Sequence, residues 1–167
     1  MGITFYKEKK IFKLDTATSS YVIQIYKGNI IHCLYYGGLI PDVNFTDYVF
    51  RDWIAAFSPA SPWVDEEHYS MDIAPLEYSG FGVGDFRKSA VAIRNNDGNN
   101  CTDFRYVSHN IYKGKHKLSG IPSTYANDDD ECMTLDIYTQ DEVTGAQAIL
   151  TYTVFENYGV MTKSVKL

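Results

Sequence analysis

The stretch "SYVIQIYKGNIIHCLYYGG" (residues 20–38) decides the fold class that the sequence predicts. Side chains alternate in its first seven residues, which places Tyr21, Ile23 and Ile25 on one face of an extended segment. The triplet "KGN" is a turn signal, and a second apolar run follows over residues 30–36. Two strands joined by a three-residue connection that contains glycine are typical of a β-hairpin.

The same alternation returns near the end of the chain. In "CMTLDIYT" (132–139), Met133, Leu135 and Ile137 share one face, and residues 146–156 and 160–167 form two more strand candidates joined by "NYG". A further strand is expected in "AVAIRN" (90–95), and the only helical candidate spans residues 48–57. The 14 tyrosines favour pleated sheets. We therefore predict an all-β fold, an antiparallel β-sandwich that is part of a larger sandwich.

The chain of 167 residues suits one domain, or the N-terminal portion of one. The alternation stops over residues 39–79, which carry four of the five prolines and both tryptophans. A long irregular loop of this kind usually has a function or contacts a partner. The sequence ends within a strand pattern, so we expect it to continue in a longer protein.

Charge and cysteine content exclude several classes of protein. A net charge of −6 argues against nucleic-acid binding, and the lysines at 7, 9 and 10 and at 113, 115 and 117 are expected on solvated strand faces. No segment approaches the ~18 apolar residues of a membrane span. The three widely spaced cysteines indicate buried free thiols in a reducing compartment and lack the paired spacing of a zinc site. We predict a cytoplasmic protein without metal or cofactor.

The stretch "SGFGVGDFR" (79–87) has glycine at every second position over Gly80, Gly82 and Gly84. A dinucleotide fingerprint requires a helix next, whereas a strand is predicted here. We interpret these glycines as structural, allowing close backbone approach or positive φ in a bent β segment. The acidic runs at 65–67, 128–131 and 141–142 suit solvated turns, and no nucleophile elbow occurs. No catalytic residue is predicted.

The best candidate for ligand contact lies in "FRDWIAAFSPASPW" (50–63). An aromatic platform beside a carboxylate suits the apolar faces and hydroxyl edges of sugars. Trp53 stands here beside Arg51 and Asp52, and these three are the predicted substrate-binding residues. The alternative is that the aromatic residues pin the loop to the sheet or fill a subunit interface.

Five stretches, in order along the chain, resemble the amino-terminal region of bacterial α-galactosidases of glycoside hydrolase family 36. They are "SSYVIQIYKGNIIHCLYYG", "LEYSGFGVGDFR", "YKGKHKLSGIPSTY", "TLDIYTQD" and "LTYTVFENYGVMTKSV". The resemblance implies a large antiparallel sandwich that precedes a (β/α)₈ barrel. It also implies that the parent enzyme hydrolyses terminal α-linked galactose from sugars such as melibiose or raffinose. Its catalytic aspartates would lie in the downstream barrel of about 250 residues, which is absent from this chain.

The resemblance further implies a homo-oligomer in which the N-terminal loop reaches a neighbour's active site. It also implies a sugar-contacting aspartate shortly before "AFSP". Ile54 occupies that place here, and Asp52 lies two residues earlier. The function expected is non-catalytic: scaffolding, oligomer contacts and shaping of the substrate entrance. Two alternatives stay open, a stand-alone carbohydrate-binding module using Trp53 and Trp63, and a purely structural or assembly domain.

Overall fold

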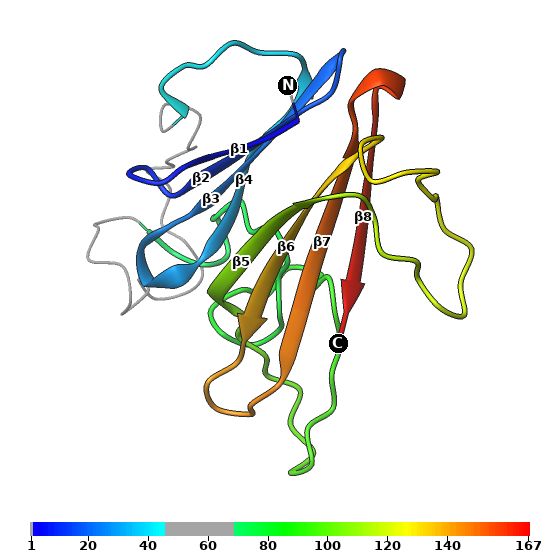
Figure 1. Ribbon diagram of the computed structural model, residues 1–167. Helices are drawn as coiled ribbons and strands as arrows, with labels where there is room; N and C mark the ends of the chain where they lie inside the picture. The colour runs from blue at the N-terminus through cyan, green and yellow to red at the C-terminus, as the bar shows by residue number, and fades with distance from the viewer. Residues whose placement is uncertain (1, 46–68) are drawn as a thin grey trace.

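The structure is a computed structural model that describes residues 2–45 and 69–167. It contains two four-stranded antiparallel sheets that lie face to face (Figure 1). The first sheet consists of β1 (Gly2–Tyr6), β2 (Ile11–Asp15), β3 (Ser19–Ile25) and β4 (Ile31–Gly38), in that order. The second consists of β5 (Arg105–Lys113), β6 (Met133–Gln140), β7 (Gln147–Phe155) and β8 (Val160–Lys166). The predicted all-β antiparallel sandwich is confirmed.

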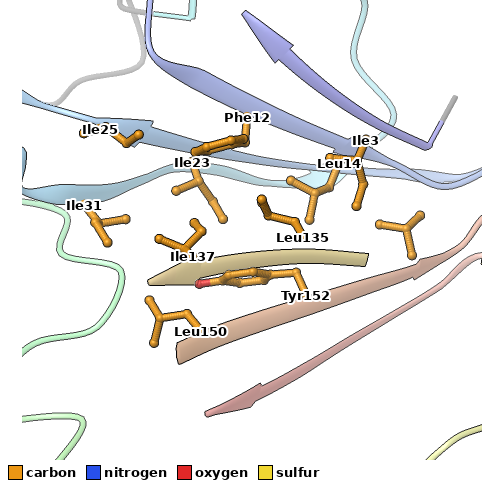
Figure 2. Packing of buried hydrophobic residues seen from close by; sticks show 11 residues of the cluster. Ile3, Phe12, Leu14, Ile23, Ile25, Ile31, Leu135, Ile137, Leu150 and Tyr152 are labelled. Atoms are coloured by element: carbon orange, nitrogen blue, oxygen red, sulfur yellow. The ribbon is translucent and has the colours of Figure 1, made fainter. Parts of the chain in front are cut away.

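The hydrophobic core lies between the two sheets (Figure 2). Because side chains alternate along a strand, every second residue of each strand points to this inner face. The first sheet contributes Phe12, Leu14 and Ile23, and the second contributes Leu135, Ile137, Leu150 and Tyr152, all at most 4% exposed. Each fully buried side chain of this kind stabilises the fold by about 1.5–3 kcal/mol relative to an exposed one.

The predicted hairpin over residues 20–38 is confirmed. β3 and β4 pair in antiparallel register and are joined by the short 3₁₀ turn η1 (Lys27–Asn29). Gly28 has φ +65°, a conformation that glycine adopts without the penalty of a side chain. The three C-terminal strands lie within one or two residues of their predicted bounds, and β7 and β8 are joined by the 3₁₀ turn η3 (Glu156–Tyr158).

Two expectations about local structure were wrong. Residues 90–95 form no strand; the backbone is irregular there and a turn follows, closed by the hydrogen bond from Asn95 N to Asn99 O at 2.8 Å. The alternation reflects the half-buried side chains of Val91 and Ile93, but the backbone of this stretch pairs with no strand among residues 2–45 and 69–167. The lysines at 7, 9 and 10 lie in the turn between β1 and β2, and those at 115 and 117 follow the end of β5, so of the two clusters only Lys113 lies on a strand.

The glycines of residues 79–87 are structural, as expected, although the segment is irregular and not a bent strand. A methyl group on Gly80 would overlap the carbonyl oxygen of Thr102. Next to this crossing, Thr102 N donates to Phe81 O at 3.0 Å. Gly82 and Gly84 have φ of +88° and +78°, which other residues rarely adopt. Glycine is therefore required where two loops cross at van der Waals contact.

The three cysteines form no disulfide. Cys132 is buried as predicted and Cys33 is half-buried, whereas Cys101 is exposed, so the expectation of buried thiols was wrong for that residue. Among the described residues, no helix has the length and apolar character required to cross a membrane.

Candidate functional site

The predicted substrate-binding residues Arg51, Asp52 and Trp53 lie outside the described residues, as do Trp63 and the helical candidate at 48–57. Their placement stays a prediction. The structure describes the residues on either side of this segment. Those residues show which face of the sandwich the segment leaves from and returns to.

Phe45, at the first end, lies on the outer face of the first sheet. It is 1% exposed and packs with Ile11, Val22 and Leu34. Its ring centroid is 5.8 Å from that of Tyr6. An aromatic side chain buried in this way anchors the backbone at this point with about 1.5–3 kcal/mol of apolar burial.

Tyr69, at the second end, lies on the same outer face. Its hydroxyl is 2.9 Å from Nε2 of His32, a fully buried side chain of β4. Its ring also stacks with that of Tyr26 at a centroid distance of 5.4 Å. In register, His32 pairs with Gln24, so both side chains point away from the core. The two residues that flank 46–68, Phe45 and Tyr69, therefore both lie on the outer face of the first sheet.

A buried lysine fixes the loop that leads to Phe45. Lys13 of β2 is 4% exposed, and its Nζ lies 3.0 Å from Asp15 and 2.9 Å from Asp42. Burial opposes the charged ammonium, but the hydrogen bonds to the two carboxylates outweigh it and raise the pKa of Lys13. Hydrogen bonds from Tyr6 and Lys13 lower the pKa of Asp42 in turn.

A buried polar cluster centred on Glu77 joins the two sheets. Its carboxylate accepts hydrogen bonds from the Tyr21 hydroxyl of β3 (2.6 Å to Oε2) and the Tyr152 hydroxyl of β7 (2.7 Å to Oε1). Oε1 also pairs with the ammonium of Lys163 on β8. The backbone of Glu77 adds to the edge of β4, since its N–H donates to Ile31 O at 2.9 Å. One side chain thus contacts three strands.

This cluster is suited to holding the structure and not to acid–base catalysis. Burial and the negative charge of Glu77 raise the pKa of Tyr21 and of Tyr152, so both hydroxyls stay protonated donors at neutral pH. Burial likewise raises the pKa of the nearby Cys33 thiol, which is the opposite of what a nucleophilic cysteine requires. A carboxylate with its acceptor oxygens in use is a strong cross-link.

The "GDFR" stretch closes the loop that follows Tyr69. Arg87 donates from Nη2 to Met71 O and Ala74 O, each at 2.9 Å, and from Nε to Asp85 Oδ1 at 2.9 Å. Asp85 is 3% exposed. Because the guanidinium binds two carbonyl oxygens and a buried carboxylate, it fixes residues 71–74 beside the Tyr69 end of the segment.

Sequence reasoning missed Glu77, although one signal for it was present. In "VMTKSVKL", Lys163 occupies the same face as Met161 and Val165, so an ammonium is placed where apolar residues are expected. A charge on an inward face predicts a buried partner of opposite charge. The partner lies 86 positions earlier, in a stretch without periodicity, and could not be identified by pattern.

Comparison with known proteins supplies the context for these features. The sequence profile of "Glycosyl hydrolase family 36 N-terminal domain" matches residues 29–167. The α-galactosidase AgaA of Geobacillus stearothermophilus is 34% identical over 166 residues, which are 99% of this chain and 22% of that protein. The bifunctional α-galactosidase/sucrose kinase AgaSK of Mediterraneibacter gnavus is 36% identical over 170 residues, 100% of this chain and 18% of the relative.

Solved structures of α-galactosidases show the same similarity. The crystal structure of the α-galactosidase AgaB from Geobacillus stearothermophilus superposes with a TM-score of 0.88 at 34% identity, over 99% of this chain and 22% of that one. A variant of AgaA in complex with raffinose gives a TM-score of 0.85 at 35% identity, over 93% and 21%. The chain therefore spans about a fifth of the length of the relatives that it matches.

Proposed function

The chain belongs to the glycosyl hydrolase family 36 N-terminal domain family, and from this membership we propose that it is the non-catalytic front part of an α-galactosidase. The parent protein then hydrolyses terminal α-linked galactose from sugars such as melibiose or raffinose. The observation that carries the proposal is that nearly the whole chain matches about a fifth of several α-galactosidases. A barrel of about 250 residues has room in the remaining length of such proteins.

The role proposed for this part is to scaffold the barrel and to shape the substrate entrance. Arg51, Asp52 and Trp53 are the proposed sugar contacts. They belong to a segment whose two ends, Phe45 and Tyr69, are held on the outer face of the first sheet. Ends fixed in this way support the presentation of the segment to a neighbouring subunit of a homo-oligomer, because binding then requires less ordering of the chain. We also place the parent in the cytoplasm, since three cysteines without a disulfide suit a reducing compartment.

The test begins with the chain itself and the intact mass of the native protein. We expect no release of nitrophenol from 4-nitrophenyl α-galactoside by the purified 167-residue chain, and turnover by the longer native protein. Turnover by the chain alone, lost on substitution of one of its acidic residues, contradicts the non-catalytic role. A native mass equal to that of this chain contradicts the proposal that the chain is part of a longer enzyme.

The substrate contact is tested separately in the active parent. We expect Asp52→Ala to lower kcat/KM for raffinose at least tenfold, while the melting temperature stays unchanged. Glu67→Ala, in the same segment, is the matched control and is expected to retain wild-type kinetics. Equal kcat/KM for Asp52→Ala and the unaltered parent would show that Asp52 does not contact the substrate. Sedimentation of the parent at micromolar concentration tests the oligomer, and a monomer contradicts the inter-subunit role.

A further inference from the structure

A groove of about 460 Å³ lies on the outer face of the second sheet. Its floor is formed by side chains of β5, β6, β7 and β8, and its roof by the segment that follows β5. In Figure 1 this segment, coloured yellow-green to yellow, leaves β5, runs out past β8 and returns to β6. The roof belongs to the stretch "YKGKHKLSGIPSTY", to which the proposed function assigns no role.

The floor of the groove is a row of polar side chains that the strand register brings together. Asp136 of β6 pairs with Thr151 of β7, which pairs with Ser164 of β8. Asp136 is 9% exposed, and its Oδ1 accepts a hydrogen bond from Thr151 Oγ1 at 2.6 Å. Tyr112 interacts with the same carboxylate. A carboxylate has about four acceptor positions, so Asp136 has capacity for further hydroxyl donors from a ligand.

Three lysines lie at the rim of the groove. Lys115 and Lys117 lie in the roof, and Lys166 lies at the end of β8. None of the three ammonium groups forms an ion pair with any residue in the described parts of the chain. Together these three ammonium groups attract an anion.

The walls between the floor and the rim include the apolar side chains of Leu118, Ile121 and Ile149. His116 stands against the Tyr112 ring at a centroid distance of 5.0 Å. Apolar walls with a few convergent polar groups are typical of small-molecule sites, and the volume lies in the usual range for them. The combination calls for a ligand with C–H faces, several hydroxyl groups and one negative charge.

We propose that this groove binds an anionic sugar, that is, a pyranose that carries a phosphate or a carboxylate. Its hydroxyl groups donate to Asp136 and contact Thr151 and Ser164, while its anionic group pairs with Lys117 and Lys166. The two halves of the ligand therefore meet different parts of the groove. Neither a neutral sugar nor an inorganic anion satisfies both.

Isothermal titration calorimetry on the purified chain tests the proposal with four probes: D-galactose 6-phosphate, D-galacturonate, D-galactose and inorganic phosphate. We expect at least one anionic sugar to bind at least tenfold more tightly than both D-galactose and phosphate. Its affinity falls as the salt concentration rises from 50 to 500 mM, because added salt screens the lysines. Failure of both anionic sugars to bind overturns the proposal, as does equal affinity for the neutral sugar or for phosphate alone.

Variants then locate the site. The double variant Lys117→Gln/Lys166→Gln is expected to lose at least tenfold in affinity for the anionic sugar, with an unchanged unfolding midpoint. Ser164→Ala removes one hydroxyl contact from the floor and is expected to lose a few-fold. Lys88→Gln, at an exposed lysine that does not line the groove, is the matched control and is expected to bind like the wild type. Wild-type affinity in the double variant overturns the assignment to this groove.

Discussion

The side chains on the outer face of the first sheet are buried under other residues, whereas the outer face of the second sheet is polar and open. On the first, Ile11 and Val22 are fully buried beneath Phe45, and His32 is fully buried against Tyr69. On the second, the corresponding positions of β6, β7 and β8 carry a carboxylate and hydroxyl groups that line a groove. Both sheets share the same strand order and one core.

The difference teaches that strand pattern alone does not assign a role to a sheet face. The first outer face carries both apolar and polar buried side chains, and it is covered by the parts of the chain around Phe45 and Tyr69. A polar face is stable in water and is available for a ligand. Four predictions test this contrast, ordered from the largest expected effect to the smallest.

Glu77→Ala tests whether the Glu77 carboxylate links the two sheets, so that they unfold together. We expect a loss of about 3–5 kcal/mol, because the change leaves an ammonium and two tyrosine hydroxyls without their acceptor. Urea unfolding followed by tyrosine fluorescence and by circular dichroism measures it, with exposed Glu142→Ala as the control. Separate transitions in the wild type would show that the sheets are independent, and a loss below about 1 kcal/mol would rule out the cross-link.

A matched pair of isoleucines tests the two outer faces directly. Ile11→Ala, at a fully buried position on the first, is expected to cost about 2–5 kcal/mol through lost burial and a cavity. Ile149→Ala, at a half-buried position on the second, is expected to cost about 1 kcal/mol. The difference in urea midpoints measures the contrast. Equal costs would mean that the second face is as tightly covered as the first.

We expect the loss of folding stability at low pH to depend more on the second sheet than on the first. Burial alone raises the pKa of Asp141, but hydrogen bonds from the backbone amides of Asp103, Thr144 and Val143 outweigh it and hold that pKa below its usual range. A lowered folded-state pKa gives stability that is present above the unfolded-state pKa and is lost as the pH falls through the folded-state value.

We therefore expect Asp141→Asn to lose about 1–2 kcal/mol at pH 7 and to show a flatter fall in stability from pH 5 to pH 3. Asp42→Asn, at an exposed carboxylate on the first sheet's outer face, is the paired control. It is expected to lose less than Asp141→Asn, because the Lys13 ammonium keeps its ion pair with Asp15 at 3.0 Å. Free energies of unfolding measured at pH 7, 5 and 3 for both variants test this expectation. A larger change in the pH dependence of stability for Asp42→Asn than for Asp141→Asn would contradict it.

The smallest effect is expected at the base of the roof over the groove, where Lys113 pairs with Asp130. Both side chains are largely exposed, so the hydrogen bond that lowers the pKa of Asp130 contributes little to folding in water. Asp130→Asn is expected to leave the thermal midpoint unchanged. A measurable drop would show that the roof depends on this pair.

Much of the fold could be predicted from the sequence because alternation reports burial locally. Tyr21, Ile23 and Ile25 were placed on one face, and the structure buries Ile23 and Ile25 in the core and packs Tyr21 against it. The strand expected at 90–95 was wrong because alternation indicates which side chains are exposed. It does not show whether a neighbouring strand is present to form backbone hydrogen bonds. Glu77 could not be recognised, since its partners come from distant strands, and for Asp141 the local turn contacts were within reach of the sequence but the distant donor Asp103 was not. The floor of the groove follows from the alternation of β6, but its roof is irregular.

The distance in sequence between the two halves of the core has a consequence for synthesis on the ribosome. The first sheet is complete at Gly38, but Leu135 and Ile137, which cover its inner face, emerge about 100 residues later. At about 5–20 residues per second, the nascent chain presents Phe12, Leu14 and Ile23 uncovered for about 5–20 s. Chaperones that bind apolar segments therefore have a long window of access, and slower initiation or cooler growth is expected to raise the soluble yield.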